Sequence, residues 1–360
     1  MSDDPLRDIR INIDSIDTEL LRLLSERAEL VHQVGEIKKK SDLEIYAPER
    51  EESLLQNLIA KNQGLLTETS IRAIYREIMS AALALEEDLK IAFLGPKGTW
   101  THQAAINKFG NSVGYLPLSS LADVFNKVER READYGVVPI ENSTEGAVNH
   151  TLDLFADSPL RIFAQIILPL ENHVLSKVPL EAVAKLYSHP HVFGQCRKWI
   201  SENFAHGETV EVSSTAKAAA LAQEDPSGAA LGGALLAELF GLDILDRSVQ
   251  DNAFAQTRFL VIGRRTCPPT GNDRTSIMFS VTDEPGALFH ALKPFNQFQI
   301  NLSKIESRPN RRESWEHYFY VDLAAHYTDD RFETALDELR SHCSFVKILG
   351  SYPDTKPNFA

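Results

Sequence analysis

The sequence is poor in cysteine, and its three thiols, Cys196, Cys267 and Cys343, lie far apart. Three widely spaced cysteines form neither a disulfide framework nor a CxxC metal-binding motif. Long apolar runs are also absent, since none approaches the roughly 20 residues that a membrane-spanning helix needs. The acidic start, MSDDPLRDIR, lacks the apolar core of a secretory signal. We therefore expect a reduced, cytoplasmic protein without membrane contact.

Basic charge and cofactor motifs are scarce as well. The 37 lysines and arginines are outnumbered by 51 aspartates and glutamates, which gives a net charge of −14. Such a chain has no overall electrostatic affinity for nucleic acid or for anionic lipid. The motifs GxGxxG and GxxxxGK[ST] are missing, and His189 and His191 lack a third ligand at a suitable spacing. We expect no nucleotide cofactor, no metal ion and no nucleic acid partner.

Three stretches of different periodicity divide the chain. Residues 1–89 are predicted to be helical, residues 90–266 alternate short β-rich runs with helices, and residues 274–352 follow the order βαββαβ. Turn-forming residues in CPPTGNDRT (267–275) predict a linker before the last stretch. We expect a multidomain fold with an all-α dimerising domain, an α/β domain of mostly parallel strands in two lobes, and a small α+β domain.

The helical stretch begins with a long amphipathic helix, predicted over residues 5–40, and continues with helices at about 48–64 and 70–87. Apolar residues recur every three or four positions along the first helix. They are Ile9, Ile13, Ile16, Leu20, Leu23, Leu30, Val34 and Ile37. Two shorter helices cannot cover so long a stripe within one chain. The pattern therefore predicts a helical homo-oligomer.

Arg27 interrupts this apolar stripe, where an unpaired guanidinium would be costly. Lys38 lies eleven residues later and returns to within about 20° of Arg27, about 16 Å along the helix. Arg10 is about 25 Å from Arg27 and about 100° round, so only an antiparallel partner helix brings it to the same ligand. Glu51 and Glu86 lie on the apolar sides of the other helices. The set indicates a dianion site at a dimer interface; solvated helix charges are the alternative, above all for Arg10.

The arrangement of Arg10, Arg27, Lys38, PEREE (48–52) and Glu86 resembles the all-helical chorismate mutase family. The resemblance implies an interlocked dimer with two sites that convert chorismate to prephenate. Arg10 of one chain and Arg27 of the other would hold the two substrate carboxylates. Lys38 and Glu86 would face the ether oxygen. Such a rearrangement needs a held conformer and stabilised charge, and it needs no nucleophile.

Two further residues complete the implied mutase site, and two positions depart from the family pattern. Arg50 and Glu51 would line the site, with Glu51 receiving the ring hydroxyl. Some family members carry Asp at the position of Ala47 and Gln at the position of Glu86. Because Glu86 donates to the ether oxygen only when it is protonated, we expect mutase activity to fall as rising pH deprotonates this residue.

Four turns of the α/β stretch carry hydroxyl, amide or glycine residues where a strand is predicted to end. They are GPKGT (95–99), PIENSTEG (139–146), SHPHVFGQC (188–196) and VSSTAKAA (212–219). One such turn is ordinary helix capping. Four of them match the place where an open α/β sheet binds its ligand, beyond the carboxyl ends of its strands.

Together with QTRFLVIG (256–263), these turns resemble the prephenate dehydratase family over about residues 90–266. The resemblance implies a two-lobed fold like that of periplasmic binding proteins. It also implies loss of carbon dioxide and water from prephenate to give phenylpyruvate. Thr257 would assist the leaving hydroxyl, and Arg258 would bind a carboxylate or support Thr257. The other implied substrate contacts are Thr99, Asn142, Ser143, Thr144, Ser188, Gln195, Ser213, Thr215 and Phe259. The chain departs from the family at Ala255, where Asn is frequent.

EPGALF (284–289) and KIESRP (304–309) in the last stretch resemble the phenylalanine-binding motifs of ACT domains. Gly286 allows a close backbone approach at a helix start. The resemblance implies phenylalanine bound between two such domains and feedback inhibition through coupling of distinct sites. The implied contacts are Gly286, Ala287, Leu288, Asn301, Leu302, Glu306, Ser307 and Arg308.

These resemblances predict an enzyme of phenylalanine biosynthesis with chorismate mutase and prephenate dehydratase activities. Two alternatives stay open. A dehydratase that prefers arogenate would share the fold, because the difference lies in how the pocket receives an amino acid or a keto acid side chain. A non-catalytic binding or regulatory protein would also keep the two lobes, although the TRF run, the ENST turn and the mutase cations argue against it. The sequence does not distinguish a dimer from a tetramer.

Overall fold

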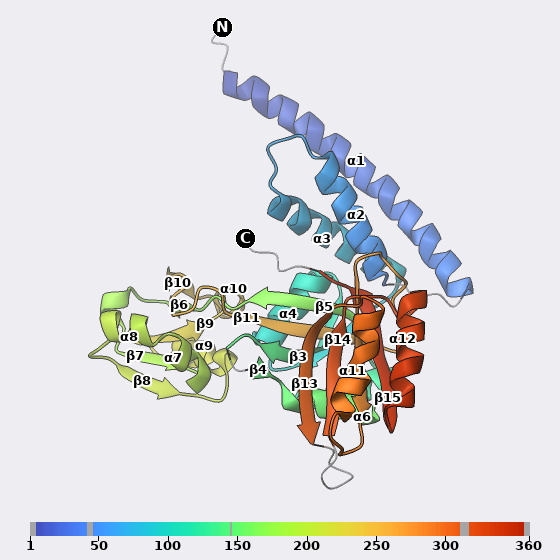
Figure 1. The fold of residues 1–360 in the computed structure, drawn as a ribbon. Coiled ribbons are helices and arrows are strands. Elements are labelled where there is room, and N and C mark those ends of the chain that lie inside the picture. The colour runs from blue at the N-terminus through green and yellow to red at the C-terminus, as the bar shows by residue number, and fades with distance from the viewer. Residues whose placement is uncertain (1–4, 42–45, 145, 310–316, 356–360) are drawn as a thin grey trace.

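The computed structural model describes residues 5–41, 46–144, 146–309 and 317–355. The chain forms a helical domain whose first helix projects from the body, a two-lobed α/β domain, and a C-terminal α+β domain packed on one lobe (Figure 1). This multidomain fold confirms the prediction from the sequence. Among the described residues, no helix combines the length and the apolar character that crossing a membrane requires.

Three helices form the N-terminal domain: α1 (Pro5–Lys40), α2 (Pro48–Lys61) and α3 (Glu68–Glu86). Pro48 occupies the first turn of α2, where its missing N–H is not needed. Thr67 caps α3 by accepting a hydrogen bond from the Ser70 N–H. α1 packs against α3 and leaves its apolar stripe, from Ile9 to Ile37, between 45 and 62% exposed. A single chain therefore does not cover this stripe.

The first lobe is built on a sheet of order β2-β1-β3-β11-β5, with the short β4 beside β3. Its strands are β1 (Lys90–Leu94), β2 (Gly114–Leu118), β3 (Tyr135–Asn142), β4 (Gly146–Ala147), β5 (Arg161–Pro169) and β11 (Gln256–Gly263). Its helices are α4 (Trp100–Phe109), α5 (Leu121–Glu129) and α6 (Asn149–Asp157).

The second lobe is built on a sheet of order β10-β6-β9-β7-β8. Its strands are β6 (His173–Ser176), β7 (Lys185–Ser188), β8 (Glu208–Glu211), β9 (Gly228–Gly232) and β10 (Asp243–Asp246). Its helices are η1 (Leu180–Ala182), α7 (Pro190–Gln195), α8 (Arg197–Asn203), α9 (Thr215–Glu224) and α10 (Leu235–Phe240).

The strands of the two lobes are less uniformly parallel than predicted. β1 is parallel to β2 and β3, and β7 is parallel to β8 and β9. β11 instead runs antiparallel to both β3 and β5, because the chain returns from the second lobe into the middle of the first sheet. β6 is also antiparallel to β9 and β10. The returning strand brings Thr257 beside the end of β3.

The C-terminal domain is an antiparallel sheet of order β13-β14-β12-β15 with two helices on one face. Its elements confirm the predicted order: β12 (Asp273–Ser280), α11 (Ala287–Gln297), β13 (Leu302–Pro309), β14 (His317–Leu323), α12 (Asp330–Ser341) and β15 (Phe345–Pro353). On the other face, Met278 and Tyr320 share a buried core with Ile162 of the first lobe. Gly350 lies so close to β5 that a Cβ there would collide with the Ile162 backbone. The two domains therefore pack as one unit.

A buried aromatic cluster joins the helical domain to the first lobe. Tyr46 is 3% exposed, and its ring packs against Phe109, Tyr135 and Phe163. Aromatic pairs of this kind stabilise an interface beyond the area that they bury. The segment before α2 therefore anchors the helical domain on the α/β domain of the same chain.

Candidate active sites and effector site

A half-buried ion pair joins the ends of α1 and α3. Lys38 Nζ lies 3.3 Å from Glu86 Oε2, and only 7% of the Glu86 side chain is exposed. Gly35 lies directly over Glu86, since a Cβ at this glycine would come within 3.0 Å of the Glu86 Cγ. Arg27, about three turns earlier on α1, is also half-buried. The structure thus brings Lys38, on the helix that carries Arg27, together with Glu86 at the end of α3.

The other predicted mutase residues lie away from this pair. Arg10 and Arg50 are exposed, and neither makes an ion pair within the part of the chain that the structure describes. Glu51 accepts hydrogen bonds from the Tyr46 hydroxyl at 3.0 Å and from Lys108 Nζ at 3.1 Å. Burial and the Glu51 charge raise the pKa of Tyr46 well above its usual value, so its hydroxyl stays a donor. Within one chain, Lys108 of α4 therefore holds the Glu51 carboxylate.

Thr257 and Asn142 form a cross-strand pair at the ends of β11 and β3. Asn142 Nδ2 donates to Thr257 Oγ1 at 3.0 Å, and Asn142 Oδ1 accepts from the Thr144 N–H at 2.8 Å. Because the Thr144 N–H can only donate, the Asn142 atom that faces it is the amide oxygen. Thr257, which is 7% exposed, thus receives a hydrogen bond on its oxygen and keeps its own proton for another group.

Ser143 holds the loop after β3 against the start of β11. Its Oγ accepts from the Gln256 N–H at 3.0 Å, and its own N–H donates to the Gln256 carbonyl oxygen at 2.9 Å. Thr144 follows in the same loop and is exposed. The predicted residues Ser143 and Thr144 therefore flank the pair formed by Thr257 and Asn142.

The turn after β1 is tied to its own helix. Thr99 caps α4, since its Oγ1 accepts from the His102 N–H at 3.4 Å and donates to the Leu94 carbonyl oxygen at 3.1 Å. The Gly98 N–H donates to His102 Nδ1 at 3.1 Å, so this amide is not available to an anion. Burial and the nearby Lys97 lower the pKa of His102 to about 4, which keeps the accepting ring neutral. No sequence pattern singles out His102.

The turns of the second lobe supply buried and capping hydroxyls. Ser188 is fully buried and donates to a backbone carbonyl of β9 at 2.9 Å. Ser214 caps α9 and lies between the predicted residues, of which Thr215 is buried and Ser213 is exposed. His189 caps α7. The described residues contain no cluster of three His, Cys, Asp or Glu side chains placed to hold a metal ion.

The turn after β1 meets the second lobe. A Cβ at Gly98 would lie 2.6 Å from Leu236 of α10 and 3.5 Å from Ala216 of α9. A Cβ at Gly233 would lie 3.0 Å from the Trp100 ring. The end of β1 and the start of α9, two of the four predicted ligand turns, are therefore in contact between the lobes.

Asn172 is a buried polar residue that the sequence analysis misses. It lies where the chain crosses from β5 to β6, and its Nδ2 donates to Gln195 Oε1 at 3.2 Å. Its N–H donates to Gln250 Oε1, at 2.9 Å, in the segment that leads back to β11. Its Oδ1 is buried and has no hydrogen-bond partner among the described residues. The available signal is the polar ENH between the apolar runs LPL and VLS. Asn172 thus ties the predicted Gln195 to both crossings between the lobes.

Arg258 and Phe259 do not join Thr257. Successive side chains of a strand point to opposite faces, and Arg258 Nη1 lies 2.5 Å from Asp322 Oδ2 of the C-terminal domain. Phe259 is 1% exposed and packs in the core of the first lobe. Arg258 therefore makes an interdomain ion pair and Phe259 makes a core contact, while support of Thr257 by Arg258 stays a prediction.

The predicted effector residues lie at the start of α11 and along β13. Gly286 caps α11 with a φ of +84°, a conformation that favours glycine. Glu306 and Arg308 are on the face of β13 that meets the first lobe, where Arg308 pairs with Asp153 at 3.2 Å. Ser307 is exposed on the other face. The remaining predicted contacts lie at the starts of the same two elements: Ala287, Leu288, Asn301 and Leu302.

Three family models match the chain in order. They are chorismate mutase type II over residues 9–87, prephenate dehydratase over residues 91–267 and the ACT domain over residues 275–343. A protein of Aquifex aeolicus named bifunctional chorismate mutase/prephenate dehydratase is 47% identical, over 97% of this chain and 98% of its own length. An Escherichia coli protein of the same name is 32% identical, over 98% of this chain and 97% of its own length.

A solved structure covers the larger part of the chain. Prephenate dehydratase from Arthrobacter aurescens, in complex with L-Phe, is 34% identical and has a TM-score of 0.69. The match covers 75% of this chain and 92% of that one. With the full-length relatives and the three family models in order, it follows that the chain belongs to the family of bifunctional chorismate mutase/prephenate dehydratases.

Proposed function

We propose that the mutase reaction of this family takes place around the pair formed by Lys38 and Glu86. The pair places an ammonium and a carboxyl group 3.3 Å apart in a half-buried position. Charge that develops on the ether oxygen of chorismate is stabilised more strongly there than in water. Arg27 binds one substrate carboxylate, and Arg10 of a second copy binds the other. The rearrangement is unimolecular, so the residues act by holding its conformer and its charge.

A second copy of the chain is needed to complete this site. Arg10 and Lys38 are 28 residues apart on the single helix α1, which separates them by about 42 Å along its axis. One chain cannot bring both to the same small ligand. The apolar stripe of α1 is exposed and projects from the body (Figure 1), which is where a second copy would pack. A homodimer through α1 is therefore the proposed minimum assembly.

Replacing Glu86 with Gln tests whether mutase activity requires a protonated carboxyl group at Glu86. Only the protonated carboxyl donates to the ether oxygen, so the turnover of the wild-type mutase is expected to fall as pH rises. The Gln side chain donates at every pH, so Glu86→Gln is expected to flatten the profile. Glu87→Gln, at the exposed neighbouring position, serves as the control and keeps the wild-type slope. A wild-type slope in Glu86→Gln rejects this role.

The dehydratase reaction is assigned to the place where the two lobes face each other, with Thr257 hydrogen-bonded to the leaving hydroxyl of prephenate. The C–C bond to the ring carboxylate breaks and releases carbon dioxide, and its electron pair makes the ring aromatic as the C–O bond breaks. The departing hydroxide takes a proton from Thr257 and leaves as water, and solvent then returns a proton to Thr257. The observation that carries this assignment is the hydrogen bond from Asn142 to Thr257 at 3.0 Å. A donor on Oγ1 polarises the hydroxyl and strengthens its own donation. The hydroxyls and amides of the four turns hold the carboxylates.

Phenylalanine is the proposed effector of the C-terminal domain, as the L-Phe complex of the Arthrobacter relative suggests. Gly286→Ala adds a Cβ at a φ of +84°, which strains the backbone at the start of α11. We expect the phenylalanine concentration that halves dehydratase activity to rise about tenfold. Gly271→Ala is the matched control, because Gly271 has a φ of +89° and no atom within 4 Å of a built Cβ. Wild-type potency in Gly286→Ala would count against this effector site.

One incubation tests the two activities together. Purified protein is mixed with chorismate, and prephenate and phenylpyruvate are followed with and without phenylalanine. Both products should appear in sequence, and phenylalanine should suppress the second. Chorismate and added prephenate that stay unchanged would indicate a non-catalytic binding protein. A parallel assay with arogenate decides the other alternative, since faster turnover of arogenate identifies the amino acid as the preferred substrate.

A cytoplasmic location is proposed for the enzyme. Cys196, Cys267 and Cys343 are free thiols, and burial raises the pKa of each. Unpaired, unreactive thiols are typical of proteins that work in a reducing compartment.

A further inference from the structure

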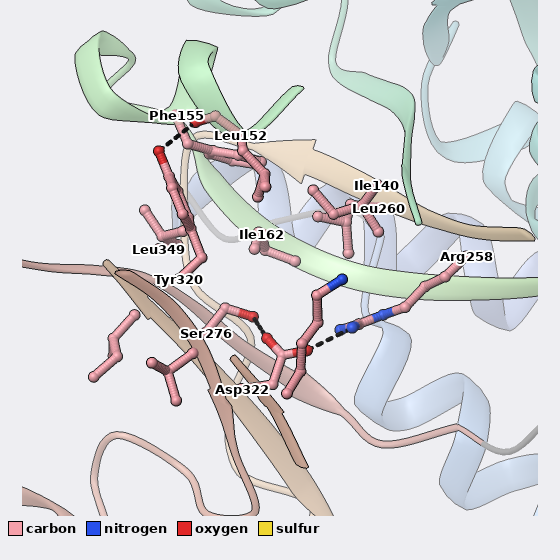
Figure 2. Close-up of a pocket in the computed structure, with 13 residues that line it drawn as sticks. Ile140, Leu152, Phe155, Ile162, Arg258, Leu260, Ser276, Tyr320, Asp322 and Leu349 are labelled. Atoms are coloured by element: carbon pink, nitrogen blue, oxygen red, sulfur yellow. Dashed lines mark hydrogen bonds and ion pairs between the residues drawn. The ribbon is translucent and has the colours of Figure 1, made fainter. Parts of the chain in front are cut away.

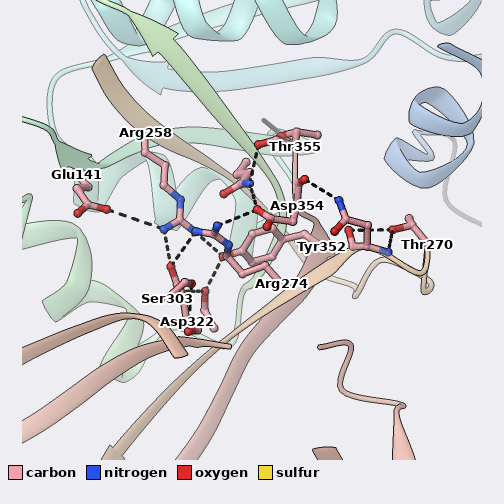
Figure 3. Close-up of polar contacts among 12 residues, drawn as sticks. Glu141, Arg258, Thr270, Arg274, Ser303, Asp322, Tyr352, Asp354 and Thr355 are labelled. Atoms are coloured by element: carbon pink, nitrogen blue, oxygen red, sulfur yellow. Dashed lines mark hydrogen bonds and ion pairs between the residues drawn. The ribbon is translucent and has the colours of Figure 1, made fainter. Parts of the chain in front are cut away.

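Two neighbouring cross-strand pairs at the ends of β11 and β3 point in opposite directions. Thr257 is paired with Asn142, and Arg258 is paired with Glu141 at the next position. The first pair forms the proposed dehydratase site. The second pair faces the C-terminal sheet, and Arg258 reaches across to Asp322 (Figure 3). The strand ends that carry the dehydratase residues are therefore also a contact surface for the ACT domain.

Arg258 is held almost entirely by the ACT domain. Its Nη1 lies 2.5 Å from Asp322 Oδ2, and its Nη2 donates to the Tyr352 hydroxyl at 2.7 Å. Ser276 donates to the other Asp322 oxygen at 2.5 Å. Burial alone would raise the pKa of Asp322, but Arg258 and Ser276 hold it below its usual value. The pair is therefore ionised and buried, and Arg274 Nη1 lies 3.5 Å from the same Asp322 oxygen. Removal of Asp322 leaves the Arg258 guanidinium buried without its carboxylate.

The surroundings of this pair leave room for rearrangement. A cavity of about 20 Å³, enough for about one water molecule, adjoins Arg258, Lys304 and Asp322 (Figure 2). Arg258 Nε is buried without a hydrogen-bond partner in the described part of the chain. Lys304 of β13 lies 2.8 Å from Glu141, so the ACT sheet touches the ends of both β3 and β11. The ACT sheet therefore meets the ends of both strands beside a small cavity and a donor of Arg258 that has no partner among the described residues.

We propose that Arg258 is a positioning residue of the dehydratase: by binding Asp322 it fixes the end of β11, and so sets the contact between Thr257 and Asn142 from the ACT domain. The inference rests on the proposed roles of Thr257 and of phenylalanine. Phenylalanine binding favours one arrangement of the ACT sheet, and the ion pair transmits this preference to the residue next to Thr257. The ACT domain thereby contributes to turnover even when phenylalanine is absent.

Asp322→Asn tests this role without altering any residue that meets prephenate. We expect the dehydratase kcat to fall about tenfold with KM within about twofold, because alignment is lost and substrate binding is kept. Phenylalanine is expected to bind with unchanged affinity by calorimetry but to inhibit several-fold less. The unchanged phenylalanine affinity reports that the ACT domain is folded, and mutase turnover in the same sample reports the same for the helical domain. Wild-type kcat and wild-type inhibition in Asp322→Asn would overturn the proposal.

One further variant separates positioning from general loosening of the interface. Lys347 donates to the carbonyl oxygens of Phe155 and Ser158 across the same interface, and these acceptors lie in α6 and directly after it rather than in β3 or β11. Lys347→Met is therefore expected to keep wild-type kcat and inhibition; losses equal to those of Asp322→Asn would overturn the proposal.

If Asp322→Asn does not fold, Arg258→Met combined with Asp322→Leu replaces the buried charges with apolar side chains, which such sites tolerate. Wild-type inhibition in that double variant would also overturn the proposal. Thr257→Ala tests the assignment of Thr257 separately. A wrong assignment of Thr257 is therefore distinguishable from a wrong role for Arg258. If phenylalanine does not inhibit the wild type, the kcat and KM values of Asp322→Asn decide the question alone.

Discussion

Thr257→Ala is expected to lower dehydratase turnover at least about a hundredfold, the usual cost of removing a proton donor, while mutase turnover stays at the wild-type level. The hydroxyl that receives a hydrogen bond from Asn142 at 3.0 Å is lost, and the leaving group then departs as unassisted hydroxide. The proposed mutase site lies around Lys38, on α1 of the helical domain, so mutase turnover should be unaffected. Turnover of prephenate and of chorismate, measured on the same preparation, gives both values.

The conservative variant separates chemistry from structure. Thr257→Ser keeps the hydroxyl and should recover much of the lost turnover, because Asn142 still has an oxygen to donate to. Thr257→Ala leaves the partly buried Asn142 amide without that acceptor, which costs about 1 kcal/mol of stability. A circular dichroism spectrum of the wild-type shape shows that the α/β domain has folded. Near-wild-type prephenate turnover in the Ala variant would reject Thr257 as the group at the leaving oxygen.

The contrast between Thr257 and Arg258 shows which features a sequence motif predicts and which it does not. The TRF run predicts a functional strand, and the period of two along a strand predicts that its first two side chains face opposite ways. Which face meets the substrate depends on what packs against each side. The contact between Arg258 and Asp322 joins residues 64 positions apart, and no local pattern contains it. The motif therefore locates the strand, and the docking of the ACT domain decides the role of its second residue.

In the helical domain too, local patterns predict the helices but not the contacts between them. The spacing of apolar residues predicts α1 within the bounds observed, Pro5–Lys40, because helix formation here depends on local periodicity. The same periodicity places Glu51 on an apolar side but does not tell which neighbour it meets. Lys108 and Tyr46 hold its carboxylate in this chain, which follows from the docking of α2 on α4. Asn172 and His102 are missed for a similar reason, since their partners come from turns whose packing the sequence does not show.

Mixing two inactive variants is expected to restore mutase activity if the site is shared between chains. Arg10→Ala and Lys38→Ala should each lower mutase turnover at least about a hundredfold, because each removes a charge that stabilises the bound dianion or its transition state. In a dimer of one Arg10→Ala chain and one Lys38→Ala chain, one site receives both defects and the other receives none. Co-expression with two affinity tags gives a statistical mixture, and about a quarter of wild-type turnover should return.

A matched pair shows whether this recovery reflects the geometry of α1. Arg27 and Lys38 lie on the same side of one helix and belong to the same site in the proposed dimer. Arg27→Ala mixed with Lys38→Ala therefore leaves a defect in every site, and no activity should return. Recovery in this pair, or its absence when Arg10→Ala is mixed with Lys38→Ala, would show that the two ends of α1 do not meet across a dimer. Prephenate turnover should be unchanged in all of these mixtures, because the defects lie in α1 alone.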